Sequence, residues 1–166
     1  MDQERDELLE TWLREYGTSI LRTCFVCLSD MRDAEDALQE TFLKAWRAMD
    51  RYERRNGASE KTWLTHIAIN VCRDMRRTRW FRHVDRAVEI ENLPLPVSPP
   101  SAEHIALTQA IMRLKGKYRE VVLLHCDQGL TVRDTAKALG IAAPAVINRL
   151  KKARAALAEA LGEGDA

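Results

Sequence analysis

A cluster of side chains that can bind DNA lies near the C-terminal end of the chain. Asn and Arg side chains can read base edges in the major groove, and Lys and Arg side chains can bind phosphates. The cluster lies within residues 143–161, whose apolar periodicity predicts a helix, and consists of Asn148, Arg149, Lys151, Lys152 and Arg154. This chemistry indicates a helix that contacts duplex DNA. The alternative is an ordinary helical hairpin with a solvated basic face.

Residues 131–150 have the steric pattern of a helix-turn-helix. Thr131 is the expected N-cap of a short first helix that ends at Leu139. Ala136 is small where two crossing helices must approach closely, and Gly140 permits the turn between them. The second helix is expected to carry Pro144 in its first turn and to bury Ile141, Val146 and Leu150.

A second stretch, residues 61–80, combines an aromatic side chain with a polar and cationic helix face. Trp63 lies at the start of the predicted helix, beside a polar loop at residues 51–61. The polar face recurs at i, i+4, i+8, i+11 and i+15 and consists of Thr62, His66, Asn70, Arg73 and Arg77. An aromatic ring beside cations suits single-stranded DNA, since stacking one base is worth about 1–3 kcal/mol. The residues favour equally that Trp63 anchors the core and that the arginines are a solvated helix end.

Residues 33–46 place acidic side chains on the face of a predicted helix that points away from its apolar stripe. Asp33 is the expected N-cap of this helix. The face consists of Asp36, Glu40, Leu43 and Arg47. An acidic face with an exposed leucine can receive a basic partner helix. Most acidic helix faces are only solvated, so this pattern alone is a weak indication.

No residue pattern indicates catalysis, a metal or a cofactor. Cys24 and Cys27 form a C-x-x-C within an apolar helical stripe, but a zinc site would need two further ligands at suitable spacing. His125 and Cys126 are adjacent, so their side chains point to different helix faces. All four cysteines, Cys72 included, lie in apolar-periodic stretches, which favours buried thiols in a reducing cytosol. The expectation is a protein without enzymatic activity.

The elements that position these residues are predicted to be helices throughout. Four of the five prolines fall between Pro94 and Pro100, where they exclude helix and predict an extended linker. The predicted fold class is therefore all-α, with an N-terminal helical bundle at 1–87, a linker at 88–102 and a C-terminal helix-turn-helix domain at 103–166. Helices are expected at about 7–28, with a break near Gly17, and at 33–49, 62–79, 102–114, 118–126, 131–139 and 143–161.

The charge distribution supports two separate binding surfaces. The net charge is only +1, yet residues 1–50 are acidic overall and residues 51–86 and 111–166 are basic. A basic block can follow phosphates, whereas an acidic block can face a basic protein surface. No apolar run is long enough for a membrane span, and the charged N-terminus is unlike a secretory signal. The expected location is the cytoplasm.

Taken in order, these stretches resemble the bacterial RNA polymerase sigma factors of the extracytoplasmic-function (ECF) group, in the sigma-70 family. Residues 33–46 are similar to the core-binding helix of the family's region 2. Residues 62–77 are similar to its helix for promoter melting and −10 reading. Residues 118–124, together with the helix-turn-helix, resemble region 4, which reads the −35 element. The resemblance covers nearly the whole chain.

The resemblance implies that the chain docks on the clamp coiled coil of the largest polymerase subunit and on the flap of the second-largest subunit. The residues implied in core binding are Asp33, Asp36, Gln39, Glu40, Leu43 and Arg47. Those implied in −10 DNA binding and melting are Asn56, Ser59, Thr62, Trp63, Asn70, Arg73, Arg76 and Arg77. Those implied in −35 DNA binding are Thr131, Ala143, Ala145, Asn148, Arg149, Lys151, Lys152 and Arg154. An anti-sigma partner, often membrane-bound in this family, is implied as well, although this chain is not itself inserted in a membrane.

The recognition helix departs from the family's usual pattern. Ile147 stands where a Lys is common, and the first turn lacks a hydroxyl. The departure implies an unusual or weaker −35 preference. Two other readings remain open at this point: a helix-turn-helix regulator that binds DNA alone and senses a signal through residues 1–86, and a thiol or zinc sensor built on Cys24 and Cys27.

Overall fold

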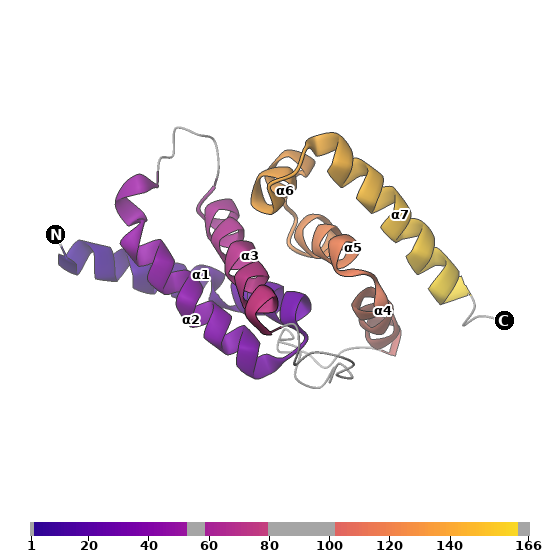
Figure 1. Cartoon of the computed structure of the whole chain (residues 1–166), viewed down its shortest axis with the longest axis horizontal. Coiled ribbons are helices and arrows are strands. Elements are labelled where there is room, and N and C mark those ends of the chain that lie inside the picture. The colour runs from indigo at the N-terminus through magenta and orange to yellow at the C-terminus, as the bar shows by residue number, and fades with distance from the viewer. Residues whose placement is uncertain (1, 53–58, 80–101, 163–166) are drawn as a thin grey trace.

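The computed structural model describes residues 2–52, 59–79 and 102–162, and every regular element in these ranges is a helix (Figure 1). The all-α prediction is confirmed for this part of the chain. Before the linker lie α1 (Asp2–Leu28), α2 (Met31–Arg47), the 3₁₀ turn η1 (Met49–Arg51) and α3 (Glu60–Arg79). After it lie α4 (Ala102–Arg113), α5 (Gly116–Val121), the π-helical η5 (Val122–Asp127), α6 (Val132–Leu139) and α7 (Ala143–Gly162). The predicted linker falls outside the described residues, apart from Ala102, which begins α4.

The N-terminal half is a bundle of α1, α2 and α3 around an apolar core. Trp12, Ile20 and Leu64 are fully buried in it. Helix α1 continues through Gly17, so the predicted break there is wrong. Glycine in a helix costs about 1 kcal/mol relative to alanine, and burial of the turns on either side of Gly17 outweighs that cost.

The start of α2 also differs from the prediction. Asp30, not Asp33, is the N-cap, and its carboxylate Oδ1 accepts a hydrogen bond from the backbone N–H of Asp33 at 2.9 Å. The cap lies three residues earlier because Asp30 has the extended backbone that an N-cap needs. Asp33 is instead buried in the first turn of α2.

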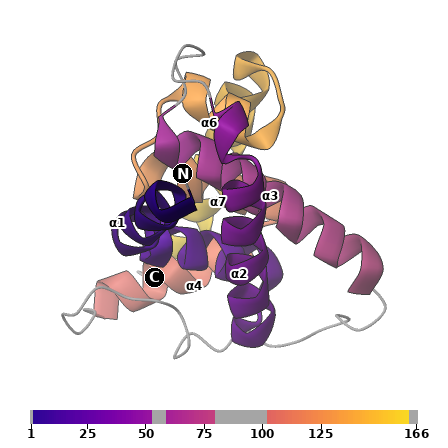
Figure 2. The same cartoon turned by 90° about the vertical axis from the view of Figure 1, so that its left-hand side faces the viewer.

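The C-terminal half packs α4, α5 and α6 against α7. Its core contains Leu124, Leu139, Val146 and Leu150, as the spacing of the helix-turn-helix predicts for the last two. The two halves are also in contact, since α3 packs against α6 and α1 packs against α5. Figures 1 and 2 show α3 on the side of the N-terminal bundle that faces the C-terminal half. The buried residues of both halves form one continuous cluster.

Candidate nucleic-acid and partner interfaces

Helices α6 and α7 form the predicted helix-turn-helix. Thr131 caps α6, because its hydroxyl accepts a hydrogen bond from the backbone N–H of Asp134 at 3.0 Å. Gly140 ends α6 with φ of 68°, a left-handed conformation that glycine adopts without the steric penalty of a side chain. The backbone N–H of Ile141 then donates to the carbonyl of Ala136 at 3.0 Å, which closes the turn. The turn sets α7 across α6 with one face exposed.

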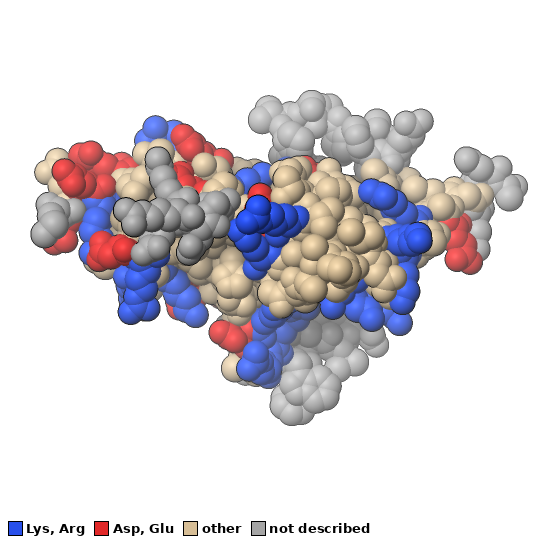
Figure 3. Space-filling view, turned by 90° about the horizontal axis from the view of Figure 1, so that it is seen from above, with Lys and Arg blue, Asp and Glu red and all other residues tan. Residues whose placement is uncertain are grey.

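The exposed face of α7 carries polar and cationic side chains. Figure 3 shows Lys and Arg side chains gathered over the half of the molecule that holds α6 and α7. Of the predicted −35 residues, Arg149, Ala143 and Ala145 are half-buried, and the exposed ones are Thr131, Asn148, Lys151, Lys152 and Arg154. Ile147 lies among them with 56% of its surface exposed, the most exposed large apolar residue in the described chain. The face therefore offers hydrogen-bond donors, cations and one apolar group.

The acidic face of α2 is largely accessible. Leu43 is 43% exposed, and Asp36, Gln39 and Arg47 are exposed with it. Glu40 is half-buried. Asp33 is the exception among the predicted core-binding residues, since it is 8% exposed. Asp36, Gln39, Leu43 and Arg47 are thus accessible to a partner, whereas Asp33 is buried in the first turn of α2.

Two of the predicted −10 DNA-binding residues, Ser59 and Thr62, stabilise the first turn of α3. The hydroxyl of Ser59 accepts a hydrogen bond from the backbone N–H of Thr62 at 3.1 Å and so caps the helix. The two hydroxyls of Ser59 and Thr62 are also bonded to each other, at 2.9 Å. Thr62 is 1% exposed, so the prediction that it belongs to the exposed polar face is wrong. Asn56 lies outside the described residues.

Trp63 belongs to an aromatic cluster that joins α1, α3 and Tyr52, the residue after η1. Its ring centroid lies 5.6 Å from that of Trp12 and 5.1 Å from that of Tyr52. Edge and tilted contacts of this kind stabilise aromatic pairs beyond their burial. In this conformation Trp63 therefore packs as a core anchor, although it remains half-exposed at the rim.

The cationic end of α3 is partly occupied by the C-terminal half. Arg76 donates through Nη2 to the carboxylate of Glu120 in α5 at 3.1 Å, and Arg73 Nη2 lies 4.0 Å from the same carboxylate. Burial lowers the pKa of Arg76, but the nearby Cys27 and Glu120 more than offset this, so its pKa is raised. Arg77 is exposed beside Asp74 at 3.7 Å. Asn70 is exposed, and its amide contacts the ring of His66.

The contact with Glu120 was not predicted from the sequence. One clue in the sequence that Glu120 is buried was its place directly before the apolar run 121–124. A second clue was Ile69, an apolar residue that lies between His66 and Arg73 on the predicted polar face. Both are buried here, which shows that α3 has a second covered face.

Three of the four cysteines are buried, as predicted, and Cys126 is exposed, contrary to the prediction. Cys126 is exposed because η5 turns its last residues toward solvent. A hydrogen bond with Cys72 and burial raise the pKa of the Cys27 thiol well above its usual value. Bonding to Cys24 and burial likewise raise the pKa of Cys72. Among the described residues, no group of His, Cys, Asp and Glu side chains is arranged to hold a metal ion.

The length and apolarity of the helices bear on whether one could span a membrane. None of those in the described ranges is both long enough and apolar enough to cross a bilayer.

Two family profiles match the chain, one on each half. Residues 12–82 match Sigma-70 region 2, which covers most of α1 and all of α2 and α3. Residues 104–157 match Sigma-70, region 4, which covers most of α4 through α7. The two profiles appear in the order that the sequence resemblance implied.

Curated relatives are RNA polymerase sigma factors. The RNA polymerase sigma factor NccH of Alcaligenes xylosoxydans xylosoxydans is 34% identical over 75% of this chain and 71% of its own length. The ECF RNA polymerase sigma factor SigM of Mycobacterium tuberculosis is 36% identical over 78% of this chain, but the match spans 65% of SigM. SigL of the same organism is 27% identical over 94% of this chain and 90% of its own length.

Two solved structures share the fold. The sigma factor RpoE from Bartonella quintana, in complex with the anti-sigma factor NepR, has a TM-score of 0.75 and 26% identity and covers 92% of this chain. CnrH in complex with the cytosolic domain of CnrY has a TM-score of 0.70 and 25% identity and covers 97% of this chain. The match of both halves to sigma-70 regions, together with these relatives, confirms the resemblance: the chain belongs to the ECF group of the sigma-70 family of RNA polymerase sigma factors.

Proposed function

We propose that this chain joins core RNA polymerase, recognises a promoter with −10 and −35 elements and promotes strand opening, without catalysis or a cofactor of its own. The observation that carries the proposal is the ordered match of sigma-70 regions 2 and 4 to two helical bodies, the second of which exposes a cationic recognition helix. The proposed units are 1–87 for region 2, 88–102 for the linker and 103–166 for region 4. The proposed location is the cytoplasm.

Core polymerase is proposed to bind the exposed face of α2. Asp36 and Glu40 supply negative charge there, and Leu43 supplies an apolar contact. Such a face complements a basic helical surface with an apolar seam, which is the chemistry proposed for the clamp coiled coil of the largest subunit. The flap of the second-largest subunit is the proposed partner of region 4.

Promoter DNA is proposed to bind two faces. Along α3, the exposed Asn70 and Arg77 and the partly exposed Arg73 and Arg76 are proposed to bind the −10 element. Along α7, Asn148 and Arg149 are proposed to read base edges at −35, while the lysines hold phosphates. Ile147 is proposed to contact the C5-methyl group of a thymine, the apolar feature of the major groove.

A partner of the anti-sigma type is proposed as well. The RpoE structure that this fold resembles was determined in complex with the anti-sigma factor NepR. The similarity spans both halves of this chain, which favours a partner that recognises the two-part fold.

Transcription from fragmented genomic DNA with core polymerase, with and without this chain, tests the proposal, and sequencing of the RNA 5′ ends gives the start sites. New start sites that share two upstream elements are expected only when the chain is present. A helix-turn-helix regulator would instead bind duplex DNA tightly by itself and add no start sites. That outcome, or an absence of co-elution with core polymerase, would overturn the proposal.

A further inference from the structure

Three arginines meet where α3 packs near the start of α5, and their charges are not balanced. Arg73 and Arg76 of α3 both approach the carboxylate of Glu120, at 4.0 Å and 3.1 Å. Arg119, the residue before Glu120, adds a third positive charge. Burial lowers the pKa of Arg119, and the charge of Arg76 acts in the same direction, so the two guanidiniums lie close enough to repel each other. These three residues, the arginine cluster, share one carboxylate among the described residues.

Several donors of the arginine cluster have no acceptor in the part of the chain that the structure describes. Glu120 accepts from Nη2 of Arg76 and leaves Nη1 unused. Arg119 donates through Nη1 to the hydroxyl of Ser29 at 3.4 Å and to the carbonyl of Met112 at 3.3 Å, so its Nη2 is unused as well. The Nε atoms of both arginines are buried without a hydrogen-bond partner. Because buried polar groups are nearly always hydrogen-bonded, the cluster has too few acceptors.

The unused terminal nitrogens of both arginines lie beside Gly116. A Cβ placed on this residue would lie 3.5 Å from Arg76 Nη1 and 3.9 Å from Arg119 Nη2. Gly116 begins α5, and its backbone is not in the left-handed conformation that favours glycine. Most residues form helices better than glycine does, so the backbone does not explain this residue. The missing side chain instead keeps a Cβ out of the space beside the two nitrogens.

The surroundings of Gly116 are basic and accessible to solvent. Residues 104–119 contain no Asp or Glu. The exposed cations in this stretch are Arg113, Lys115 and Lys117. The side chains of Arg73 and Arg76 keep 38% and 37% of their surface exposed. A dissolved anion can therefore reach the arginine cluster, and the local positive potential attracts it.

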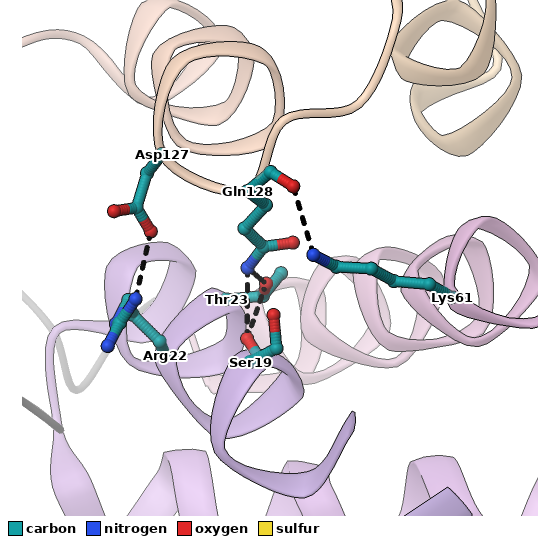
Figure 4. Close-up of polar contacts among 6 residues, drawn as sticks. All are labelled: Ser19, Arg22, Thr23, Lys61, Asp127 and Gln128. Atoms are coloured by element: carbon teal, nitrogen blue, oxygen red, sulfur yellow. Dashed lines mark hydrogen bonds and ion pairs between the residues drawn. The ribbon is translucent and has the colours of Figure 1, made fainter. Parts of the chain in front are cut away.

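The other polar contact between the two halves is built differently (Figure 4). Arg22 of α1 forms an ion pair with Asp127 at 3.1 Å. The ammonium of Lys61 in α3 donates to the backbone carbonyl of Gln128 at 3.0 Å. The side-chain amide of Gln128 in turn donates to the hydroxyl of Thr23 at 2.6 Å. Both cations there have acceptors from the protein itself and give no indication of a ligand.

We infer that the arginine cluster is a binding site for a small anion with a diphosphate group, which bridges Arg76 and Arg119 beside Gly116. Guanidinium groups bind phosphate oxygens through charge-assisted hydrogen bonds. A diphosphate supplies the acceptors that Arg76 Nη1 and Arg119 Nη2 lack, and it offsets the surplus positive charge. The group can be free or belong to a nucleotide. The inference does not depend on the proposed promoter contacts, because Arg119 is not among them.

Isothermal titration calorimetry of the full chain with inorganic pyrophosphate tests the site. The buffer contains no phosphate and includes EDTA, so that no divalent metal ion binds the probe. Saturable binding with one site per chain is expected. Arg119→Gln removes one unused donor and its charge and should weaken binding by about tenfold or more. Gly116→Ala keeps every charge but places a Cβ in the proposed site, so it should weaken binding by about fivefold or more.

Matched controls separate a specific site from general attraction between charges. Arg14→Gln removes the same charge from an exposed position on α1. Gly17→Ala makes the same substitution inside a helix, where the new Cβ meets no atom within 4 Å. Both variants should bind pyrophosphate as the wild type does. Sulfate at equal ionic strength should bind about tenfold more weakly, because its single group cannot bridge two guanidiniums as a diphosphate does.

Titration with guanosine diphosphate distinguishes the two sources of the diphosphate group. Tighter binding than that of pyrophosphate would assign the site to a nucleotide, because the nucleoside then adds contacts. Weaker binding would assign it to a free diphosphate. Either order supports the site, provided that Arg119→Gln and Gly116→Ala weaken the binding of both compounds.

Three results would overturn the inference: no saturable binding of pyrophosphate, equal affinity for sulfate, or equal losses in Arg14→Gln and Arg119→Gln. Wild-type affinity in Gly116→Ala would overturn it as well. Should Arg119→Gln fail to fold, as judged by circular dichroism, Gly116→Ala decides the matter alone. The start-site experiment reports on the proposed function independently of these titrations.

Discussion

Ile147 is an exposed β-branched residue on a helix whose other outward side chains are mainly polar or small. Its neighbour Val146 is fully buried, so the exposure of Ile147 follows from helix geometry and not from a frayed end. An apolar group at this place has no function in the core. The proposed contact with thymine methyl groups would give it one.

Exchange of thymine for uracil in the −35 element tests this contact, because the exchange removes only the methyl group. Binding of the holoenzyme is expected to weaken about fourfold for each contacted methyl, the value of one buried carbon unit. Competition binding on a promoter taken from the start-site experiment measures the effect. Ile147→Ala should bind both duplexes equally, and an undiminished uracil penalty in that variant would assign the methyl contact to another residue.

Trp63 carries two roles that a substitution series can separate. Its contacts with Trp12 and Tyr52 predict that Trp63→Ala lowers the free energy of unfolding by about 2–4 kcal/mol, as measured by urea denaturation. Trp63→Phe keeps a ring in the cluster and should lose much less. Permanganate reactivity of promoter thymines with the holoenzyme should still be reduced for Trp63→Phe, because a smaller ring stacks less well on a base. Wild-type strand opening by Trp63→Phe would confine Trp63 to the core.

At the scale of single elements, the sequence predicts which helices exist better than where they begin. Leu64, Ala68 and Val71 recur at helical spacing within the predicted helix 62–79, and all three residues are buried. The N-cap of α2 is harder to predict, because Asp30 and Asp33 are both suitable residue types. Only the backbone conformation shows that Asp30 is the cap. The run through Gly17 could not be predicted from propensity, since tertiary burial of α1 decides it.

Two glycines test how backbone conformation decides the effect of a substitution. Gly140→Ala should lower the free energy of unfolding by about 1 kcal/mol or more, because alanine is strained at a φ of 68° although no atom lies within 4 Å of the new Cβ. Gly17→Ala also meets nothing within 4 Å, but it lies in regular helix, so it should raise the free energy of unfolding by about 0.5–1 kcal/mol. Urea denaturation of both variants measures these signs. A gain in stability for Gly140→Ala would show that α6 ends differently in solution.

Helix α2 is the element expected to hold polymerase. Replacing Asp36 and Glu40 together with lysine reverses the charge of its exposed face and should abolish co-elution with core polymerase in gel filtration. Circular dichroism should stay unchanged, since neither side chain is in the core. Lysines at the exposed Glu10 and Glu159 produce the same change in net charge and should leave co-elution intact. Co-elution of the Asp36 and Glu40 variant would exclude this face as the docking site.

At the scale of the whole molecule, the sequence predicts two helical bodies but not how they meet. The seam, the contact surface between the two halves, depends on pairs far apart in the chain, such as Arg76 with Glu120 and Thr23 with Gln128. No periodicity links such pairs, so each partner looks like an ordinary surface residue when it is read alone. The candidate site was predicted as two open DNA-binding faces, and the structure shows one open face and one that is partly covered.

The buried cysteines provide a probe of this seam in the intact chain. Cys24, Cys27 and Cys72 lie between α1 and α3, and Cys27 is close enough to Arg76 and Glu120 for their charges to act on its pKa. Thiol reagents need the thiolate, and the raised pKa values of Cys27 and Cys72 keep both protonated at pH 8.

Ellman's reagent should therefore modify Cys126 rapidly and the other three thiols only as the protein unfolds. If the halves separate in Gln128→Ala, Cys27 loses part of the burial that raises its pKa, although its hydrogen bond with Cys72 remains, and a second thiol should react before unfolding. As a control, Gln109→Ala truncates an exposed glutamine on α4. An identical single fast thiol in the wild type, in Gln128→Ala and in Gln109→Ala would mean that loss of the Gln128 contacts with Ser19 and Thr23 does not separate the halves.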